Sequence, residues 1–258
     1  MKKNLLVRAV SGGLVAVALT GCESDRTKPS AVSPPRRDVV AVPRAETLTE
    51  AQILTRAAAR PPTPAGVGDW RTLFGGQSLT GWRITEFSGG GRVECRSGVL
   101  VFGKGDPFTG VTYAEDFPKV NYEVTFEAMR VAGDDFFCGL TFPVQNSFCS
   151  LILGGWGGSV VGLSNLEGAD ASENETTQFI SFEDGRWYRV RLRVSEARIE
   201  AWIEQKKVVD VVTTGRKISL RYGDIELSKP FGLAAWNTSA AVRDLKLRAI
   251  AGAVDPVR

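Results

Sequence analysis

Residues 187–203 read WYRVRLRVSEARIEAWI. From Tyr188 to Val194 every second side chain is apolar, and arginines fill the positions between them. Because successive side chains of a β-strand point to opposite faces, the apolar positions face a core and the arginines face outward. A three-residue break leads into a second strand-like run over 199–203, a spacing typical of a hairpin. This stretch predicts an antiparallel sheet with an outward row open to solvent or to acidic glycans, formed by Arg189, Arg191 and Arg193.

The chain after Asp69 consists of short β-patterned runs separated by glycine, asparagine and aspartate. No segment after residue 60 has the apolar period of a helix. About a dozen strands with regularly spaced turns predict an all-β fold, a sandwich of two antiparallel sheets over 69–250, followed by a tail at 251–258. Further runs of this kind are 98–102, 122–128, 231–236 and 242–250.

The N-terminus has the form of a bacterial export signal. A positively charged start precedes a short apolar run, and Leu19-Thr20-Gly21-Cys22 resembles a lipobox, where a signal peptidase cuts after the cysteine is acylated. The apolar run is shorter than the roughly 20 residues that a membrane-spanning helix needs. We expect residues 1–21 to be removed and Cys22 to become a lipidated N-terminus. An ordinary secretory signal and a short membrane anchor are the alternatives.

This cleavage changes the charge balance. The full chain has 32 Lys and Arg against 29 Asp and Glu, and three of the basic residues but no acidic residue lie in 1–21. The mature chain is thus balanced at 29 against 29, which gives no sign of a nucleic-acid partner. A lipidated Cys22 makes the membrane a partner and places the protein in the cell envelope, on the periplasmic face or at the cell surface.

Residues 22–68 are interpreted as a linker. The segment holds seven of the twelve prolines and no aromatic residue, a composition typical of disordered linkers. Within it, Thr47-Leu48-Thr49-Glu50 has the form of a capping box and precedes an alanine-rich run, which predicts a short helix over 48–59. Pro61-Pro62 ends this helix, and we expect it to lie loosely on the surface.

The remaining cysteines are Cys95, Cys138 and Cys149, and the chain has no histidine. Cys138 and Cys149 lie in consecutive strand-like runs and can form a disulfide in an oxidising compartment; alternatively, all three are buried free thiols. None of them has the spacing of metal ligands. The absence of histidine excludes Ser-His-Asp and Cys-His catalysis, so acid–base chemistry has to come from carboxylates, Tyr, Lys or Cys.

The stretch from Leu73 to Trp82, LFGGQSLTGW, resembles the opening motif of the 3-keto-disaccharide hydrolase domain family, which is numerous in planctomycetes. From its place at the first strand, Trp82 is interpreted as a structural plug, and Trp187 and Trp236, which lie in or beside strand patterns, are also assigned to the core. The resemblance spans residues 69–250 and includes Gly98-Val99-Leu100, Tyr122-Glu123-Val124, Gly185-Arg186-Trp187-Tyr188, Phe231-Gly232-Leu233 and 242–247.

That resemblance implies a concanavalin A-like jelly roll and hydrolysis of glycosidic bonds in 3-keto-disaccharides. A ketone at C3 acidifies the hydrogen at C2, so the site needs a base, an electrophile for the enolate and, as a possible cofactor, a divalent cation. The chain departs from the family pattern at Gly75, where asparagine is usual, and the expected mid-domain glutamate has no clear counterpart. A non-catalytic glycan-binding or envelope-interaction module is therefore the alternative function.

Gly154-Gly155-Trp156-Gly157-Gly158 is an unusual local sequence. Four glycines remove side chains from around one indole, and a flat aromatic face suits the apolar face of a sugar ring. Trp156 is therefore a candidate substrate-binding residue. The alternative is a turn that folds the indole inward.

The loop 167–176 is the most acidic segment of the domain. It can supply a catalytic base or oxygen ligands for a hard cation such as calcium; the alternative is a solvated loop. Its candidate catalytic residues are Glu173 and Glu175, and its candidate substrate-binding residues are Asp170 and Asn174.

Two further carboxylates, Asp134 and Asp135, precede the strand-like run that begins at Phe136. Their place matches the family's approach to its concave face, which makes them candidate catalytic residues. The alternative is a β-turn after Gly133, where aspartate is common.

Overall fold

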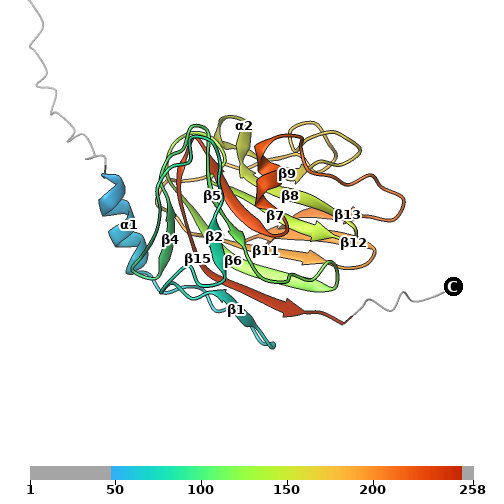
Figure 1. Ribbon diagram of the computed structural model, residues 1–258, viewed down its shortest axis with the longest axis horizontal. Coiled ribbons are helices and arrows are strands. Elements are labelled where there is room, and N and C mark those ends of the chain that lie inside the picture. The colour runs from blue at the N-terminus through green and yellow to red at the C-terminus, as the bar shows by residue number, and fades with distance from the viewer. Residues whose placement is uncertain (1–47, 252–258) are drawn as a thin grey trace, which may run out of the picture. The chain divides into compact units, whose positions relative to one another are not determined.

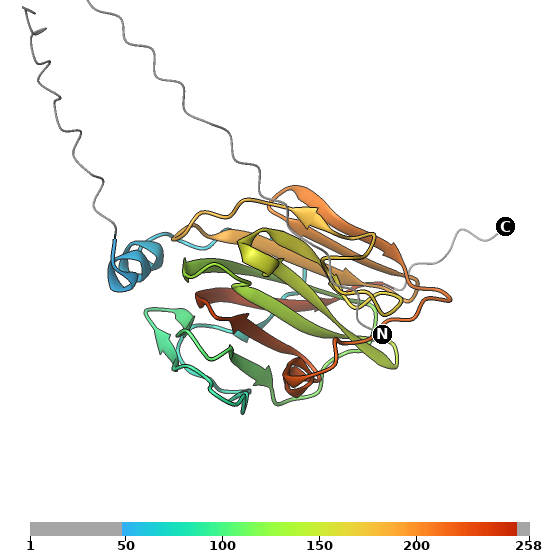
Figure 2. The ribbon, with the colours of Figure 1, turned by 90° about the horizontal axis from the view of Figure 1, so that it is seen from above.

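The computed structural model describes residues 48–251, which form two antiparallel β-sheets that lie face to face (Figure 1 and Figure 2). Their facing sides are apolar and pack together. The expected all-β sandwich is confirmed. The signal at 1–21, Cys22, the linker up to residue 47 and the residues after 251 lie outside the described part. Within residues 48–251, no helix is both long and apolar enough to cross a bilayer.

The first sheet has eight strands, and its central strands are the longest of the fold. β1 (Arg71–Phe74) pairs with β15 beside the main path. In spatial order the others are β13 (Lys206–Val212), β12 (Arg198–Ile203), β11 (Tyr188–Val194), β6 (Tyr122–Ala132), β15 (Ser239–Ala249), β4 (Val99–Phe102) and β3 (Val93–Arg96).

The second sheet has seven strands and carries the two short helical turns of the domain on its outer side. The turns are α2 (Gly155–Gly158) and η1 (Asp224–Ser228). In spatial order the strands are β10 (Gln178–Phe179), β9 (Val160–Ser164), β8 (Ser147–Gly154), β7 (Cys138–Val144), β14 (Gly232–Trp236), β5 (Phe108–Tyr113) and β2 (Trp82–Ile84).

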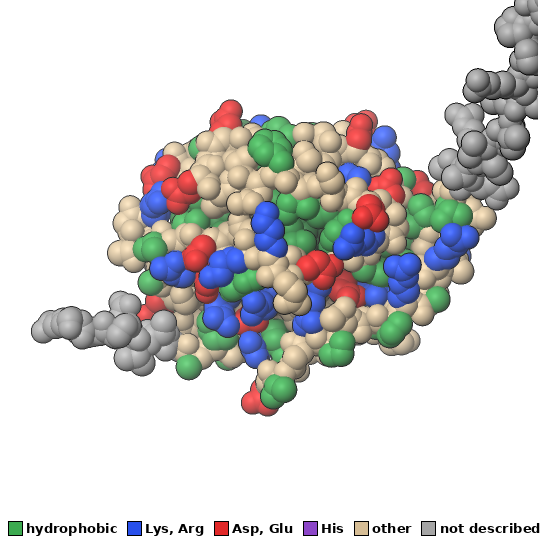
Figure 3. Space-filling model, turned by 180° about the vertical axis from the view of Figure 1, so that it is seen from behind, with side chains coloured by type: hydrophobic (Ala, Val, Ile, Leu, Met, Phe, Trp, Pro, Cys, Tyr) green, Lys and Arg blue, Asp and Glu red, His purple; other side chains and the backbone are tan. Residues whose placement is uncertain are grey.

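The hairpin predicted from residues 187–203 is confirmed as β11 and β12, which pair antiparallel. Its arginines face outward, but they do not simply contact solvent. Arg191 and Arg193 approach the carboxylate of Glu123 at 3.5 and 3.1 Å, and the Arg191 guanidinium lies 3.7 Å from the centroid of the Trp202 ring. Figure 3 shows the same interleaving of basic and acidic side chains over one face of the molecule.

Trp82 closes one part of the core, as the sequence predicts. Its indole nitrogen donates a hydrogen bond of 2.9 Å to the carbonyl of Leu73, inside the opening motif itself. Its ring packs against those of Tyr113 and Phe231, with centroids 5.1 and 6.0 Å away. A tryptophan this buried is stable because its one polar atom has a partner.

Helix α1 (Glu50–Ala58) lies within the predicted range 48–59, but two expectations about it are wrong. The capping box is formed by Thr49 and Gln52, not by Thr47 and Glu50, so the helix begins two residues later. The helix is also not loosely attached, because Ala57 is buried and its carbonyl accepts a hydrogen bond of 3.0 Å from the indole of Trp187. The apolar residues beneath it, on the outer face of the first sheet, are Val99, Val101, Met129, Val131 and Ala241.

A buried ion pair fastens this N-terminal segment to the first sheet. Arg243 on β15 donates to the carboxylate of Glu127 on β6 at 2.8 Å, and both side chains are about 5% exposed. The remaining N–H groups of Arg243 reach the carbonyls of Ala57, Arg60 and Pro61. The alanine-rich helix and the residues after it are thus held through their backbone carbonyls. The sequence of the helix gives no sign of these contacts.

The disulfide alternative is wrong, and all three cysteines in residues 48–251 are free thiols; Cys138 and Cys149 are buried as expected, but Cys95 is only half-buried. In the pairing of β7 with β8, Cys138 lies opposite Leu153 and Cys149 lies opposite Phe142. The two cysteines are therefore offset by four residues along the strands, or about 13 Å. That separation is well beyond the span of a disulfide. Burial raises the pKa of Cys149 to about 12, so the thiol is unreactive at neutral pH.

Candidate functional site

The candidate site lies on the outer face of the second sheet, where small side chains cross the strands in register. One such row runs through paired residues of β9, β8, β7, β14 and β5. Because every member of this row except Ile152 is glycine or alanine, larger residues from the surrounding loops can reach inward over the sheet. The row consists of Gly162, Ile152, Gly139, Ala234 and Gly110.

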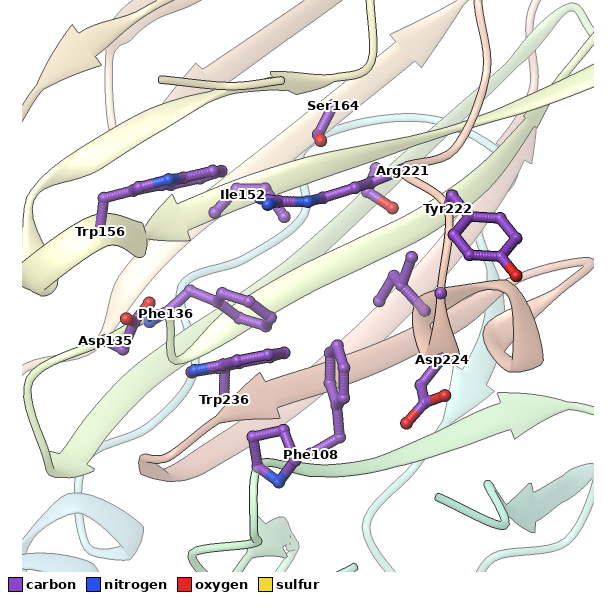
Figure 4. A pocket seen from close by; sticks show the side chains of 14 residues that line it. Phe108, Asp135, Phe136, Ile152, Trp156, Ser164, Arg221, Tyr222, Asp224 and Trp236 are labelled. Carbon is purple, nitrogen blue, oxygen red and sulfur yellow. Dashed lines mark hydrogen bonds between the residues drawn. The ribbon is translucent and has the colours of Figure 1, made fainter. Parts of the chain in front are cut away.

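A cavity of about 430 Å³ results, at the small end of the range for ligand pockets. Its floor is formed by Ser150, Ile152 and Ser164. Its walls are rich in aromatic side chains from separate loops and strands (Figure 4). These are Phe108, Phe136, Trp156, Tyr222 and Trp236.

Trp236 belongs to this wall, which corrects its assignment to the core. It is half-buried at the end of β14, and its ring meets Phe108 edge to face with centroids 4.6 Å apart. The ring centroids of Phe136 and Trp236 are 6.2 Å apart. The Phe136 ring also covers Gly139, where an added β-carbon would lie 3.0 Å from the ring. These contacts hold the aromatic wall in one arrangement.

Trp156 stands on a tight turn that exposes its indole. Its φ is +49°, an uncommon value for a bulky residue, and glycines at 154, 157 and 158 also have positive φ. Trp156 is 40% exposed and lines the pocket. The indole is therefore available to a ligand and is not folded inward.

Two charged side chains hold this turn. The carboxylate of Asp135 accepts a hydrogen bond of 2.7 Å from the backbone N–H of Phe136 and is also approached by the N–H groups of Trp156 and Gly157. From the other sheet, Arg130 reaches the carbonyl of Gly158 at 3.4 Å. Burial raises the pKa of Asp135 above the ordinary aspartate value, and the three N–H groups oppose that shift.

Arg221 supplies the positive charge of the pocket. Its guanidinium lies 5.8 Å from the centroid of the Trp156 ring and is tied to Asp170 by a 3.0 Å ion pair. Asp170 is itself oriented by the N–H and hydroxyl of Ser172, at 2.9 and 2.6 Å. Asp170, a candidate substrate-binding residue from the sequence, therefore lies behind Arg221 and does not line the pocket.

The second carboxylate of the pocket is Asp224, which the sequence does not single out. It lies in the first turn of η1, is exposed, and forms no ion pair or side-chain hydrogen bond within residues 48–251. Figure 4 places Asp135 and Asp224 at opposite ends of the pocket, with the aromatic side chains between them.

Of the candidate residues from the sequence, Asp135 and Trp156 come together in this pocket and the other five do not line it. Asp134 and Glu173 are exposed. Glu175 forms an ion pair of 2.8 Å with Arg216. Asn174 shapes its own loop, because its amide donates to the carbonyls of Leu163, Ala169 and Asp170.

The pocket does not have the donor set of a metal centre. Across residues 48–251, no three Cys, Asp or Glu side chains come together as ligands for one ion. The two pocket carboxylates lie at opposite ends of the cavity, and the guanidinium of Arg221 near the Trp156 ring repels cations. The divalent cation considered from the sequence therefore has no matching ligands here.

A sandwich of two antiparallel sheets with an aromatic and polar pocket on one outer face is an architecture that can accommodate a sugar ring. The family model described as the 3-keto-alpha-glucoside-1,2-lyase-like domain matches residues 69–248, and the chain belongs to this family. No curated protein matches the chain in sequence.

Three solved structures illustrate the wider similarity. A putative glycosyl hydrolase from Parabacteroides distasonis is 13% identical, with a TM-score of 0.45 over 70% of this chain and 94% of that one. The carbohydrate-binding module CBM66 from Bacillus subtilis is 11% identical, with a TM-score of 0.44 over 66% and 97%. The Crh5 transglycosylase in complex with NAG is 9% identical, with a TM-score of 0.49 over 75% and 88%.

Proposed function

We propose that this protein cleaves the glycosidic bond of 3-keto-glycosides in the pocket between Trp156 and Asp224. Family membership supplies the reaction class. The observation that carries the assignment to this site is the presence of an exposed indole, a guanidinium and an unpartnered carboxylate around one small cavity.

The reaction needs no metal or cofactor in principle. The C3 ketone acidifies the C2 hydrogen, and a base removes that proton to form an enolate whose charge is carried by the C3 oxygen. The enolate electrons then form the C1–C2 double bond as the C1–O bond breaks and the leaving alcohol takes up a proton. Water adds to C1 and a proton returns to C2, which yields free 3-keto-sugar.

Three requirements of this reaction match side chains of the pocket, namely a platform for the ring, a positive charge for the enolate and a base. Trp156 presents a flat face for the sugar ring, and Arg221, held by Asp170, supplies a positive charge for the enolate oxygen. Asp224 is the proposed base because its carboxylate has no partner among residues 48–251. Asp135 is less suited to that role, since backbone N–H groups already occupy its carboxylate.

Replacement of Trp156 by alanine tests the platform. We expect KM for p-nitrophenyl 3-keto-α-glucoside to rise about tenfold, because the apolar face of the sugar loses its stacking partner. Release of p-nitrophenol measures the reaction. Trp202→Ala is a matched control, since that indole lies on the outer face of the first sheet beneath Arg191. An unchanged KM in Trp156→Ala would remove Trp156 from the site.

A glycan-binding module without turnover is the second candidate. The observation in its favour is that Asp135 is engaged by the backbone, which leaves Asp224 as the one free carboxylate of the pocket. Saturable binding of 3-keto-glucose, lost in Trp156→Ala, together with no release of p-nitrophenol by the wild-type protein, would favour this candidate over the enzyme.

We also propose that the protein is lipid-anchored in the cell envelope, on the basis of the Leu19–Cys22 lipobox-like sequence. Cells fed with radiolabelled palmitate are expected to label the full-length chain, and Cys22→Ala is expected to lose the label and to keep residues 1–21, because cleavage follows acylation of the cysteine. Cys95→Ala is the control, because Cys95 belongs to strand β3 of the folded domain and is half-buried. Persistent labelling of Cys22→Ala would overturn the anchor.

A further inference from the structure

One wall of the pocket is a short arch held at both ends. Arg221 at its start is tied to Asp170, and Ile225 at its end is buried in the apolar cluster that includes Phe108. The three residues between these anchors, Tyr222–Asp224, are all exposed. The arch is therefore free in the middle and fixed on both sides of the cavity.

Tyr222 is the unusual residue of this arch. It lines the pocket, yet it is 95% exposed and its hydroxyl has no hydrogen-bond partner within residues 48–251. The other three tyrosines of the chain, Tyr113, Tyr122 and Tyr188, are buried. Figure 4 shows the Tyr222 ring turned away from the other aromatic side chains. An aromatic ring at a pocket mouth without a contact has a large apolar area available for a ligand.

The neighbouring Gly223 makes a change of position physically simple. Its φ is +127°, a backbone conformation that other residues rarely adopt, and no other part of the chain lies within 4 Å of a β-carbon built there. Rotation of an exposed tyrosine about χ1 takes place in picoseconds to nanoseconds. The ring can thus turn inward without breaking either anchor of the arch.

We propose that Tyr222 is a ligand-contacting residue that turns over the pocket mouth when a sugar is bound, so that the sugar ring lies between Tyr222 and the wall that contains Trp156. This inference rests on the proposed function and adds a closing element to it. Closure covers the space between Arg221 and Asp224, which excludes water and strengthens the electrostatic contacts of the reacting sugar. Selectivity for a small sugar then follows from the size of the closed space.

The first test follows the ring itself. The full chain is labelled with 3-fluorotyrosine, which gives four ¹⁹F resonances, and Tyr222→Phe assigns that of Tyr222. Addition of 3-keto-glucose, the expected product, should shift this resonance and leave the three buried tyrosines nearly unchanged. A Tyr222 resonance that stays in place at saturating 3-keto-glucose would overturn the inference.

The second test uses affinity for 3-keto-glucose measured by calorimetry. Tyr222→Ala is expected to weaken binding about fivefold, and Tyr222→Phe to keep it, because the contact is made by the ring. Phe179→Ala is the control, since this ring is 75% exposed on β10 and does not line the pocket. No binding by the wild-type chain contradicts the proposed function. Binding that is lost in Trp156→Ala but unchanged in Tyr222→Ala contradicts the closing role alone.

Discussion

Replacement of Arg243 by alanine is expected to lower the free energy of unfolding by about 3–5 kcal/mol, a large share of the stability of a domain. The variant leaves Glu127 buried without its partner and frees the carbonyls that Arg243 holds in the α1 segment. Urea unfolding followed by far-ultraviolet circular dichroism measures the loss.

Two further variants test whether the stability loss in Arg243→Ala comes from this buried pair or would follow the removal of any charged side chain. Arg198→Ala breaks the ion pair with Asp210 on the exposed face and is expected to leave the unfolding midpoint almost unchanged. The double variant Glu127→Leu with Arg243→Met is expected to recover the part of the loss that comes from the unpaired Glu127 charge, but not the part that comes from the freed carbonyls. A midpoint for Arg243→Ala equal to that of the wild type would show that the pair does not fasten the segment.

Replacement of Asp224 by asparagine is expected to lower kcat for a 3-keto-glycoside by a factor of about 10²–10⁴, the usual contribution of a general base. The amide has nearly the same shape but cannot accept the C2 proton. KM should change little, because the aromatic wall and Arg221 stay in place. Steady-state release of p-nitrophenol from p-nitrophenyl 3-keto-α-glucoside measures both constants.

Carboxylates outside the pocket serve as matched controls. Asp134→Asn, Glu173→Gln and Glu175→Gln each remove one charge from the same part of the domain, and each should keep wild-type kcat. If Asp224→Asn keeps full activity while one of these loses it, the base lies elsewhere. The carboxylate whose replacement abolishes activity would then be the base.

Much of the fold could be predicted because its signals are local. The alternation from Tyr188 to Val194 identified both the strand and its buried face, since side-chain direction in a strand depends only on position. Trp82 was recognised as structural from the motif in which it stands, and its hydrogen-bond partner Leu73 belongs to that same motif.

The attachment of α1 could not be predicted, because its partners are distant in sequence. The helix offers few apolar side chains, and its stability on the sheet comes from Arg243 and Trp187 reaching its backbone carbonyls. Such contacts leave no pattern in the helix's own sequence. The disulfide question was undecided for the same reason, since strand register determines which residues of β7 and β8 face each other.

The sequence by itself therefore determined the all-β class, the faces of the main strands and the family, because alternation and short motifs are readable within a few residues. Only the tertiary structure decided which residues share the candidate site. It brings together Asp135, Trp156, the Arg221–Asp224 segment and Trp236 from four separate parts of the chain and leaves Glu173, Glu175 and Asn174 outside the pocket. The physical reason is that the pocket residues meet only through the register of the sheet and through the loops that cross the small-residue row. Neither can be read from the sequence around each residue.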